Sequence, residues 1–204
     1  MNKIEQAFNE STNPSTFAEK YFSYLQSIFQ KIDMKSIEVF INMIEKTRED
    51  NKTIYFIGNG GSAATASHFS NDLGIGTRTF QKPFRAISLT DNLPVMTAIS
   101  NDYSYDDVFL LQLQTQMQEG DIVVAISASG NSKNLLKAVE WANTNGATTV
   151  GLTGFHGGKL KEMVDHTIHI PSNTGEYGPV EDCHMILDHL ISSYLNYKIK
   201  QPKG

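Results

Sequence analysis

The sequence contains a single cysteine, Cys183, among its 204 residues. One cysteine excludes an intrachain disulfide and a cluster of thiolate metal ligands, and its place in an apolar helical pattern indicates a small core residue. Long hydrophobic runs are also missing: none approaches the roughly 20 residues of a membrane span. The first residues lack the charged-then-apolar pattern of a secretory signal. We therefore expect a cytoplasmic protein that does not insert into a membrane.

Clusters of basic residues, internal repeats and low-complexity tracts are absent too. The 17 Lys and Arg residues are outnumbered by 22 Asp and Glu residues, giving a net charge of -5. A nucleic-acid-binding face usually needs a basic patch, so this balance argues against one. Hydrophobic residues make up 40% of the chain, which is ordinary for a globular protein. We expect one domain, with a helical region over 1–51, a core over 52–197 and a polar tail over 198–204.

Residues 1–51 are predicted to form two helices that divide near Asp33. In the second, apolar residues recur at helical spacing, including Ile37, Phe40, Ile41 and Ile44. The first is rich in aromatic residues, namely Phe17, Tyr21, Phe22, Tyr24 and Phe29. Such a stripe indicates either core packing or burial against another subunit.

From Thr53 onward, short apolar runs alternate with helical patterns. We expect strands at 53–57, 85–89, 121–126, 147–152 and 166–170. Helices are expected at 62–74, 92–100, 104–118, 132–145, 158–164 and 178–199. Because parallel strands need crossover connections, this alternation predicts an α/β fold, a doubly wound five-stranded parallel sheet with helices on both faces. Ligands of such sheets bind beyond the carboxyl ends of the strands.

A serine-rich turn, Ser127-Ala128-Ser129-Gly130-Asn131-Ser132, lies between one predicted strand and the next helix. Backbone N–H groups, hydroxyls and a helix N-terminus at such a turn favour an anion, with phosphate the obvious candidate. The alternative is an ordinary turn in which Ser132 caps the helix.

A second turn of this kind, Gly58-Asn59-Gly60-Gly61-Ser62, follows the first predicted strand. With Ala63 it also fits the dinucleotide-binding pattern, which makes a nicotinamide enzyme a rival interpretation. That pattern needs an acidic residue about 20 positions further on, and Asp91 comes too late. Neither turn ends in the Gly-Lys-Ser/Thr sequence of a Walker A loop, which excludes one.

These two turns, together with Leu152-Thr153-Gly154-x-x-Gly157-Gly158, resemble the sugar isomerase (SIS) phosphosugar-binding domain, and more closely its phosphoheptose isomerase branch. The resemblance runs from about residue 52 to 197. It implies an aldose–ketose isomerase acting between sedoheptulose 7-phosphate and glycero-manno-heptose 7-phosphate. It also implies a homotetramer with sites at subunit interfaces.

The resemblance also implies a set of site residues. Phosphate would be held by Ser62, Ser127, Ser129 and Ser132, with only a backbone contact from Ala128, where the family commonly has threonine. The sugar would be bound by Asn59, Gly60 and Gly61, and its hydroxyls by Asn101 and Asp102. Without the resemblance, Asn101 and Asp102 are more simply a turn or cap pair.

His68 and Asp72 stand four residues apart on one predicted helix, so they share a face and can grip one metal or substrate. Such a pair is more often a simple surface contact. The resemblance adds Glu181 and His189 on the last helix, which gives a candidate zinc site of His68, Asp72, Glu181 and His189. Glu181 and His189 are eight residues apart, roughly 12 Å along a helix. Spacing alone would instead pair Asp182 with His189.

Two of these positions depart from the family pattern, which has Glu at Asp72 and Gln at Glu181. Both replacements still bind Zn²⁺. The segment 174–180 also lacks the Asp-Arg pair often found in the family, which leaves the sugar open. Isomerisation moves a proton between adjacent carbons through an enediol, and we predict Asp72 as the base and His189 as the acid. Glu181 is also predicted to contact the substrate.

Two alternatives to an isomerase come from other classes. SIS relatives include non-catalytic regulators that sense phosphosugars and tetramers that bind the replication initiator DnaA. Those relatives tend to lose the acid/base and metal positions, so His68, Asp72 and His189 favour an enzyme. The nicotinamide enzyme is the second alternative, and it leaves the serine-rich turn unexplained.

Overall fold

The structure, a computed structural model, describes residues 2–201. Its centre is one sheet of five parallel strands in the order β2-β1-β3-β4-β5. The strands are β1 (Thr53–Gly58), β2 (Arg85–Ser88), β3 (Ile122–Ser127), β4 (Thr148–Thr153) and β5 (His166–His169). The chain winds one way from β1 and the other way from β3, as predicted for a doubly wound sheet. The switch point between β1 and β3 is where such sheets bind ligands.

Alternate side chains of the inner strands enter two separate cores. Ile54 and Phe56 of β1 belong to one hydrophobic cluster, and Tyr55 and Ile57 belong to the other. All six residues of β1 are buried, as expected for a parallel strand covered on both faces. The sheet is therefore the middle of three layers.

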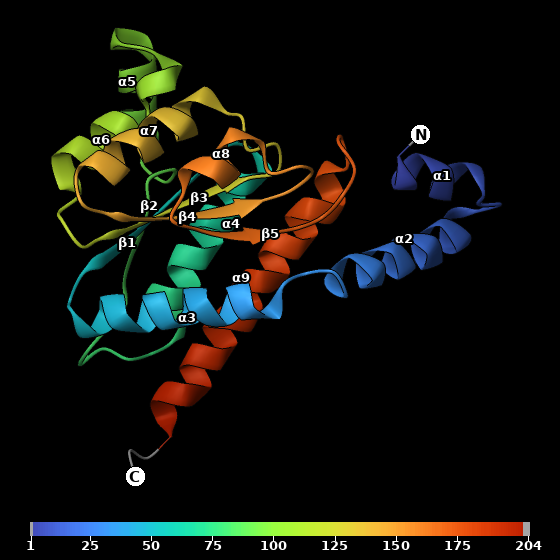
Figure 1. Cartoon of the computed structure of the whole chain (residues 1–204), viewed down its shortest axis with the longest axis horizontal. Coiled ribbons are helices and arrows are strands. Elements are labelled where there is room, and N and C mark those ends of the chain that lie inside the picture. The colour runs from blue at the N-terminus through green and yellow to red at the C-terminus, as the bar shows by residue number, and fades with distance from the viewer. Residues whose placement is uncertain (1, 202–204) are drawn as a thin grey trace.

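Helices form the outer layers (Figure 1). One face is covered by α3 (Met34–Glu49), α4 (Gly61–Asn71) and α9 (Tyr177–Lys200). The other is covered by α6 (Leu110–Gln116), α7 (Lys133–Thr144) and α8 (Gly158–Met163). Helix α5 (Leu93–Asp102) stands at the outer end of the second layer.

The prediction of two helices before residue 52 is wrong, because the structure has three. Helices α1 (Lys3–Asn9) and α2 (Pro14–Phe29) replace the first of them. Asn13 accepts a hydrogen bond from the Thr16 backbone and Pro14 occupies the first turn, so a new helix must begin there. Together α1 and α2 project from the body of the molecule (Figure 1).

Two further helices differ from the prediction. The expected helix at 104–118 is a 3₁₀ turn, Tyr105–Asp107, followed by α6. The break buries Val108 and Phe109 together and carries the Tyr105 hydroxyl to Asn59. The expected helix at 62–74 ends at Asn71 and continues as a π-helical turn, Asp72–Gly76. Such turns are frequent at functional sites, and Asp72 is its first residue.

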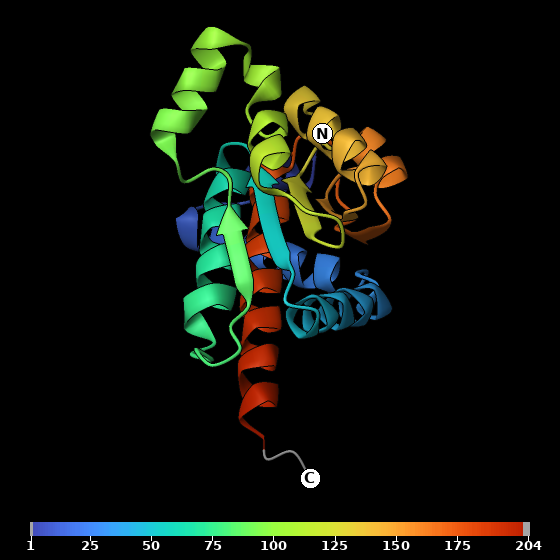
Figure 2. The same ribbon diagram turned by 90° about the vertical axis from the view of Figure 1, so that its left-hand side faces the viewer.

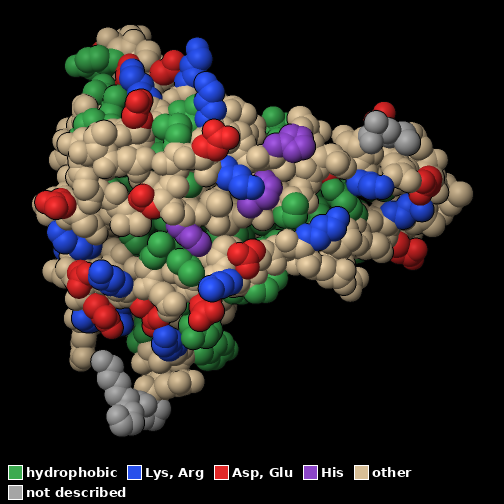
Figure 3. Space-filling model, in the orientation of Figure 1, with side chains coloured by type: hydrophobic (Ala, Val, Ile, Leu, Met, Phe, Trp, Pro, Cys, Tyr) green, Lys and Arg blue, Asp and Glu red, His purple; other side chains and the backbone are tan. Residues whose placement is uncertain are grey.

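Helices α4 and α9 lie side by side and cover the same face of the sheet (Figure 2). Gly61 contacts Glu181 near their N-termini, and His68 contacts Asp188 further along. Gly61 and His68 are seven residues apart on α4, and their partners Glu181 and Asp188 are seven residues apart, in the same order, on α9. The two helices therefore run parallel. No helix among residues 2–201 is long and apolar enough to cross a membrane. On the face shown in Figure 3, acidic and basic side chains are interspersed.

Candidate functional site: an anion pocket and an acid-base group on two helices

The two predicted turns lie next to each other at the carboxyl edge of the sheet. Gly58, the last residue of β1, pairs in register with Ile126 near the end of β3. The chain after β1 leads into α4, and the chain after β3 leads into α7. Two helix N-termini therefore meet at the switch point, where their partial positive charge favours a negative ligand.

Glycine is required at two positions of these turns by close backbone packing. A Cβ on Gly58 would lie 2.6 Å from the Ser62 carbonyl oxygen. A Cβ on Gly130 would lie 1.9 Å from the Gly157 carbonyl oxygen, and Gly130 has a φ of +64° that favours glycine. The third motif, around Gly157, thus braces the serine-rich turn, and the Leu160 N–H donates a 2.9 Å hydrogen bond to the Gly130 carbonyl.

A small pocket of about 160 Å³ opens between the turns. Of the predicted substrate residues, the ones that line it are Asn59, Ser62, Ser127, Ala128, Ser129, Ser132 and Glu181. Gly60 and Gly61 belong to the same turn, and the Glu181 carboxylate lies against Gly61. The pocket therefore gathers most of the residues that the resemblance implied, from three separate elements.

The serine hydroxyls differ in what they bind. Ser127 accepts a hydrogen bond from the Gly130 N–H at 3.0 Å, and Ser129 accepts one from the Asn131 N–H at 3.3 Å. Ser132 occupies the cap position of α7, but its hydroxyl makes no capping hydrogen bond to that helix. The predicted alternative of a simple capping turn therefore does not account for Ser132, which lines the pocket.

Asn59 is held in place by two other side chains. Its amide exchanges two hydrogen bonds of 2.9 Å with the amide of Asn134, and its carbonyl oxygen accepts a 2.7 Å hydrogen bond from Tyr105. Sequence reasoning missed Asn134, Tyr105 and Tyr177, which also lines the pocket. The only signal for Asn134 was its position just after the serine-rich turn.

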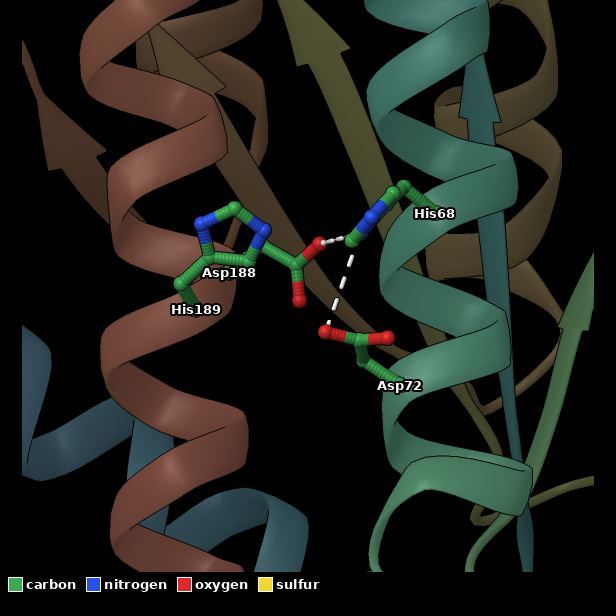
Figure 4. A group of neighbouring side chains, drawn as sticks. All are labelled: His68, Asp72, Asp188 and His189. Carbon is green, nitrogen blue, oxygen red and sulfur yellow. Dashed lines mark hydrogen bonds and ion pairs between the residues drawn. The ribbon is translucent and has the colours of Figure 1, made fainter.

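Seven residues further along α4 and α9, a second group of polar side chains gathers (Figure 4). It consists of His68, Asp72, Asp188 and His189, and one potential ligand atom from each lies within 4.8 Å of the others. The Nδ1 atom of His68 is 2.8 Å from Asp188 and 3.7 Å from Asp72. The rings of His68 and His189 are 5.0 Å apart between centroids.

The structure thus brings together three of the four predicted metal residues, His68, Asp72 and His189. Glu181 lies outside this group, in the serine-lined pocket, because eight residues of helix separate it from His189 by roughly 12 Å. Its part in metal binding stays a prediction. Asp188, which the prediction omitted, stands in the group instead.

Asn101 and Asp102 lie at the end of α5, where both are exposed and the Asn101 amide donates a 2.8 Å hydrogen bond to Asp102. They do not line the pocket described above. Their role in binding sugar hydroxyls stays a prediction.

Two carboxylates of the site have altered acidity. Burial raises the pKa of Glu181, and the nearby charge of Asp182 adds to the effect. Burial also raises the pKa of Asp188, an effect that its hydrogen bond with His68 opposes. Both carboxyl groups are therefore easier to protonate than exposed ones.

The donor set of the acid-base group suits zinc. The imidazoles of His68 and His189 and the Asp72 carboxylate offer ligand atoms within 4.8 Å of one another, which are the nitrogen and oxygen donors that Zn²⁺ takes at a three-ligand site. Chemically, the same side chains can accept and donate protons. The arrangement therefore combines an anion pocket with acid-base residues along one pair of helices.

Comparison with known proteins agrees with this arrangement. Residues 17–154 match the SIS domain family. A probable phosphoheptose isomerase of Thermoplasma acidophilum is 40% identical over 167 residues, which cover 80% of this chain and 90% of that protein. A phosphoheptose isomerase of Aliarcobacter butzleri is 32% identical over 91% of this chain and 98% of its own.

A solved structure of phosphoheptose isomerase from Neisseria gonorrhoeae superimposes with a TM-score of 0.80. It is 28% identical in sequence and covers 91% of this chain and 100% of its own. The family match spans more than half of the chain, and the curated relatives align over nearly their whole length. The chain belongs to the SIS domain family, in its phosphoheptose isomerase branch.

Proposed function

We propose that this protein interconverts sedoheptulose 7-phosphate and glycero-manno-heptose 7-phosphate. The observation that carries the proposal is the placement of the anion pocket and the acid-base group at two levels of the same helix pair. Phosphate binds at the helix N-termini, with Ser62, Ser129 and Ser132 as donors. The reacting carbons then lie toward His68 and Asp72.

The distance between the two levels supports a seven-carbon substrate. Gly61 and His68 are seven residues apart on α4, as are Glu181 and Asp188 on α9, which corresponds to roughly 10 Å. An extended chain covers about 3.5 Å per three bonds, so this interval takes about nine bonds. In a heptose 7-phosphate, six C–C bonds, one C–O bond and one O–P bond separate C1 from phosphorus. Isomerisation at C1 and C2 therefore takes place near the acid-base group when the phosphate is in the pocket.

The reaction moves a proton between C1 and C2 through an enediol. Asp72 takes the proton from one carbon and returns it to the other, while His189 donates a proton to the carbonyl oxygen and takes one back from the neighbouring hydroxyl as the new carbonyl forms. His68, Asp72 and His189 would hold zinc, and zinc, when bound, supplies Lewis acidity toward the carbonyl oxygen. Glu181 contacts the sugar between the two levels, because it lines the pocket on the side of α9.

We further propose that the chain works as a homotetramer with its sites near subunit interfaces. The projecting α1 and α2 expose Phe8 and Phe22, which are 69% and 66% accessible. Large exposed aromatic side chains on one element favour burial against a partner. Light scattering of the purified protein measures the assembly, and a monomer would contradict this part of the proposal.

Turnover of sedoheptulose 7-phosphate, monitored as formation of the aldose with and without chelator, tests the function. Asp72→Ala should abolish isomerisation while phosphosugar binding is largely kept. Glu119→Gln is the matched control, because it removes an exposed carboxylate at the opposite edge of the sheet. Phosphosugar binding without turnover in the unchanged protein would instead support a non-catalytic sensor. Unchanged turnover in Asp72→Ala would reject the role of Asp72.

A further inference from the structure

Asp188 is a carboxylate with no exposed surface on the inner side of α9. Its buried neighbours on that side include the apolar Leu187 and Ile191. Burying an ionised carboxylate is costly unless hydrogen bonds compensate for the lost water. Asp188 has two: its Oδ2 is 2.8 Å from His68 Nδ1, and its Oδ1 accepts a 3.1 Å hydrogen bond from the Ser192 hydroxyl.

His68 has two carboxylates beside its Nδ1 atom, but only one is a hydrogen-bond partner. The 2.8 Å separation from Asp188 is a hydrogen bond, whereas the 3.7 Å separation from Asp72 is too long for one. Both oxygens of Asp188 are engaged as acceptors, by His68 and by Ser192 (Figure 4 shows the first). The hydrogen on this side of the imidazole therefore belongs to Nδ1.

We propose that Asp188 is a positioning residue that fixes His68 in its Nδ1–H tautomer and leaves the Nε2 lone pair free. The consequence for catalysis rests on the proposed function, in which His68 helps to hold zinc. When one ring nitrogen of a histidine donates a hydrogen bond to a carboxylate, the ring is held in one orientation. The other ring nitrogen then becomes a more basic metal ligand. Because Asp188 accepts the hydrogen bond from Nδ1–H, Asp72 is not needed to orient His68. The Asp72 carboxylate therefore stays available for proton transfer.

Histidine tautomers are measured directly by ¹⁵N NMR on chelator-treated protein. The sequence has six histidines, and the His68 signals are identified as those lost in His68→Gln. The unchanged protein should show a protonated Nδ1 and an unprotonated Nε2 at His68. Asp188→Asn, which keeps an acceptor oxygen, should retain this tautomer. Asp188→Ala, which removes the acceptor, should shift the population toward Nε2–H.

Ser192→Ala is the matched control, because it removes the other hydrogen bond of Asp188 and leaves the one to His68. It should keep the Nδ1–H tautomer. Zinc affinity, measured by competition with a chromogenic chelator, should fall about 10- to 100-fold in Asp188→Ala, as is usual when such an outer partner is lost. It should fall much less in Asp188→Asn and in Ser192→Ala.

An Nε2–H tautomer at His68 in the unchanged protein would overturn the proposal, and this measurement does not depend on the folding of any Asp188 variant. Equal losses of zinc affinity in Asp188→Ala and Ser192→Ala would also overturn it, because they would indicate a purely structural role. A different result would reject the proposed function alone. In that case the protein would not turn over sedoheptulose 7-phosphate, while His68 would still show the Nδ1–H tautomer.

Discussion

Acidification should destabilise this protein through His184, a fully buried histidine on α9. Burial lowers the pKa of His184 from 6.5 to about 4, and the positive charge of nearby His169 contributes. The folded state therefore keeps the imidazole neutral at pH values where the unfolded chain binds a proton. Stability is unaffected well above pH 6.5 and falls as the pH drops from 6.5 toward 4.

The size of the loss follows from the shift in pKa. A difference of roughly 2.5 units at 1.36 kcal/mol per unit gives a maximum of about 3 kcal/mol. By linkage, less than half of this maximum is lost at pH 5.5 and most of it at pH 4.5. Domains are stable by only about 5–15 kcal/mol, so this single residue removes a substantial part of the margin.

Urea unfolding between pH 7.5 and 4.5 measures the effect by comparison with His184→Leu. The substitution removes the titrating group and puts an apolar side chain in a fully buried position. The difference in free energy of unfolding between the two proteins should change by most of that maximum, about 2–3 kcal/mol, over this range. Chelator and a fixed protein concentration keep metal release and subunit dissociation from contributing.

A matched control separates this effect from other histidines. His156→Gln changes an exposed histidine in the loop before α8, so the pH dependence of the unchanged protein should persist. If the free-energy difference between the unchanged protein and His184→Leu stayed constant with pH, the argument from burial would be refuted.

Three other substitutions test the pocket and its support. Gly130→Ala should lose more stability in urea than Gly175→Ala, because both residues have positive φ but only the first would place Cβ 1.9 Å from the carbonyl oxygen of Gly157; equal losses would exclude the contact as the cause. Asp121→Ala should cost about 3 kcal/mol in the same assay, since its carboxylate accepts two 2.8 Å hydrogen bonds from backbone N–H groups. Glu181→Gln should bind inorganic phosphate more tightly at pH 8, with a smaller advantage at acidic pH where the raised pKa of Glu181 makes it neutral; identical titrations at pH 8 would contradict a like-charge effect.

The sheet was predictable because each strand is a short apolar run between turn residues. The observed strands begin and end within one residue of the predicted ones at all five positions. Burial on both faces leaves no other state for such runs in a chain whose helices alternate with them. The turns after β1 and β3 were predictable for a related reason, since glycine is required where backbones approach closely, as at Gly58 and Gly130.

The missed boundaries have local causes that periodicity does not report. Asn13 and Pro14 start a helix within a stretch that was interpreted as continuous, and the aromatic spacing on either side hid that signal. The break before α6 depends on Tyr105 reaching Asn59, which is 46 residues away in the chain. Such long-range contacts override the helical pattern of 104–118, and the local sequence pattern cannot report them.

Asp188 shows why the acid-base group was only partly predictable. The pair His68 and Asp72 can be found from spacing alone, because both lie on one helix. The partner of Asp188 is 120 residues away, and neighbours such as Cys183, Leu187 and Ile191 make its side of α9 a core-facing stripe. A carboxylate within such a stripe is the one sequence signal available, because buried carboxylates are rare without a partner.

The parallel packing of α4 and α9 explains how Asp188, the carboxylate in the core-facing stripe of α9, comes to lie beside His68 of α4. The Gly61–Glu181 and His68–Asp188 contacts join residues at the same seven-residue interval, so both belong to one register of the two helices. A Cβ at position 61 would lie 2.3 Å from the Glu181 carboxylate, so the end of the Glu181 side chain would have to move away from the turn. Gly61 therefore leaves room for the Glu181 carboxylate beside the pocket, on the same pair of helices that carries the acid-base group.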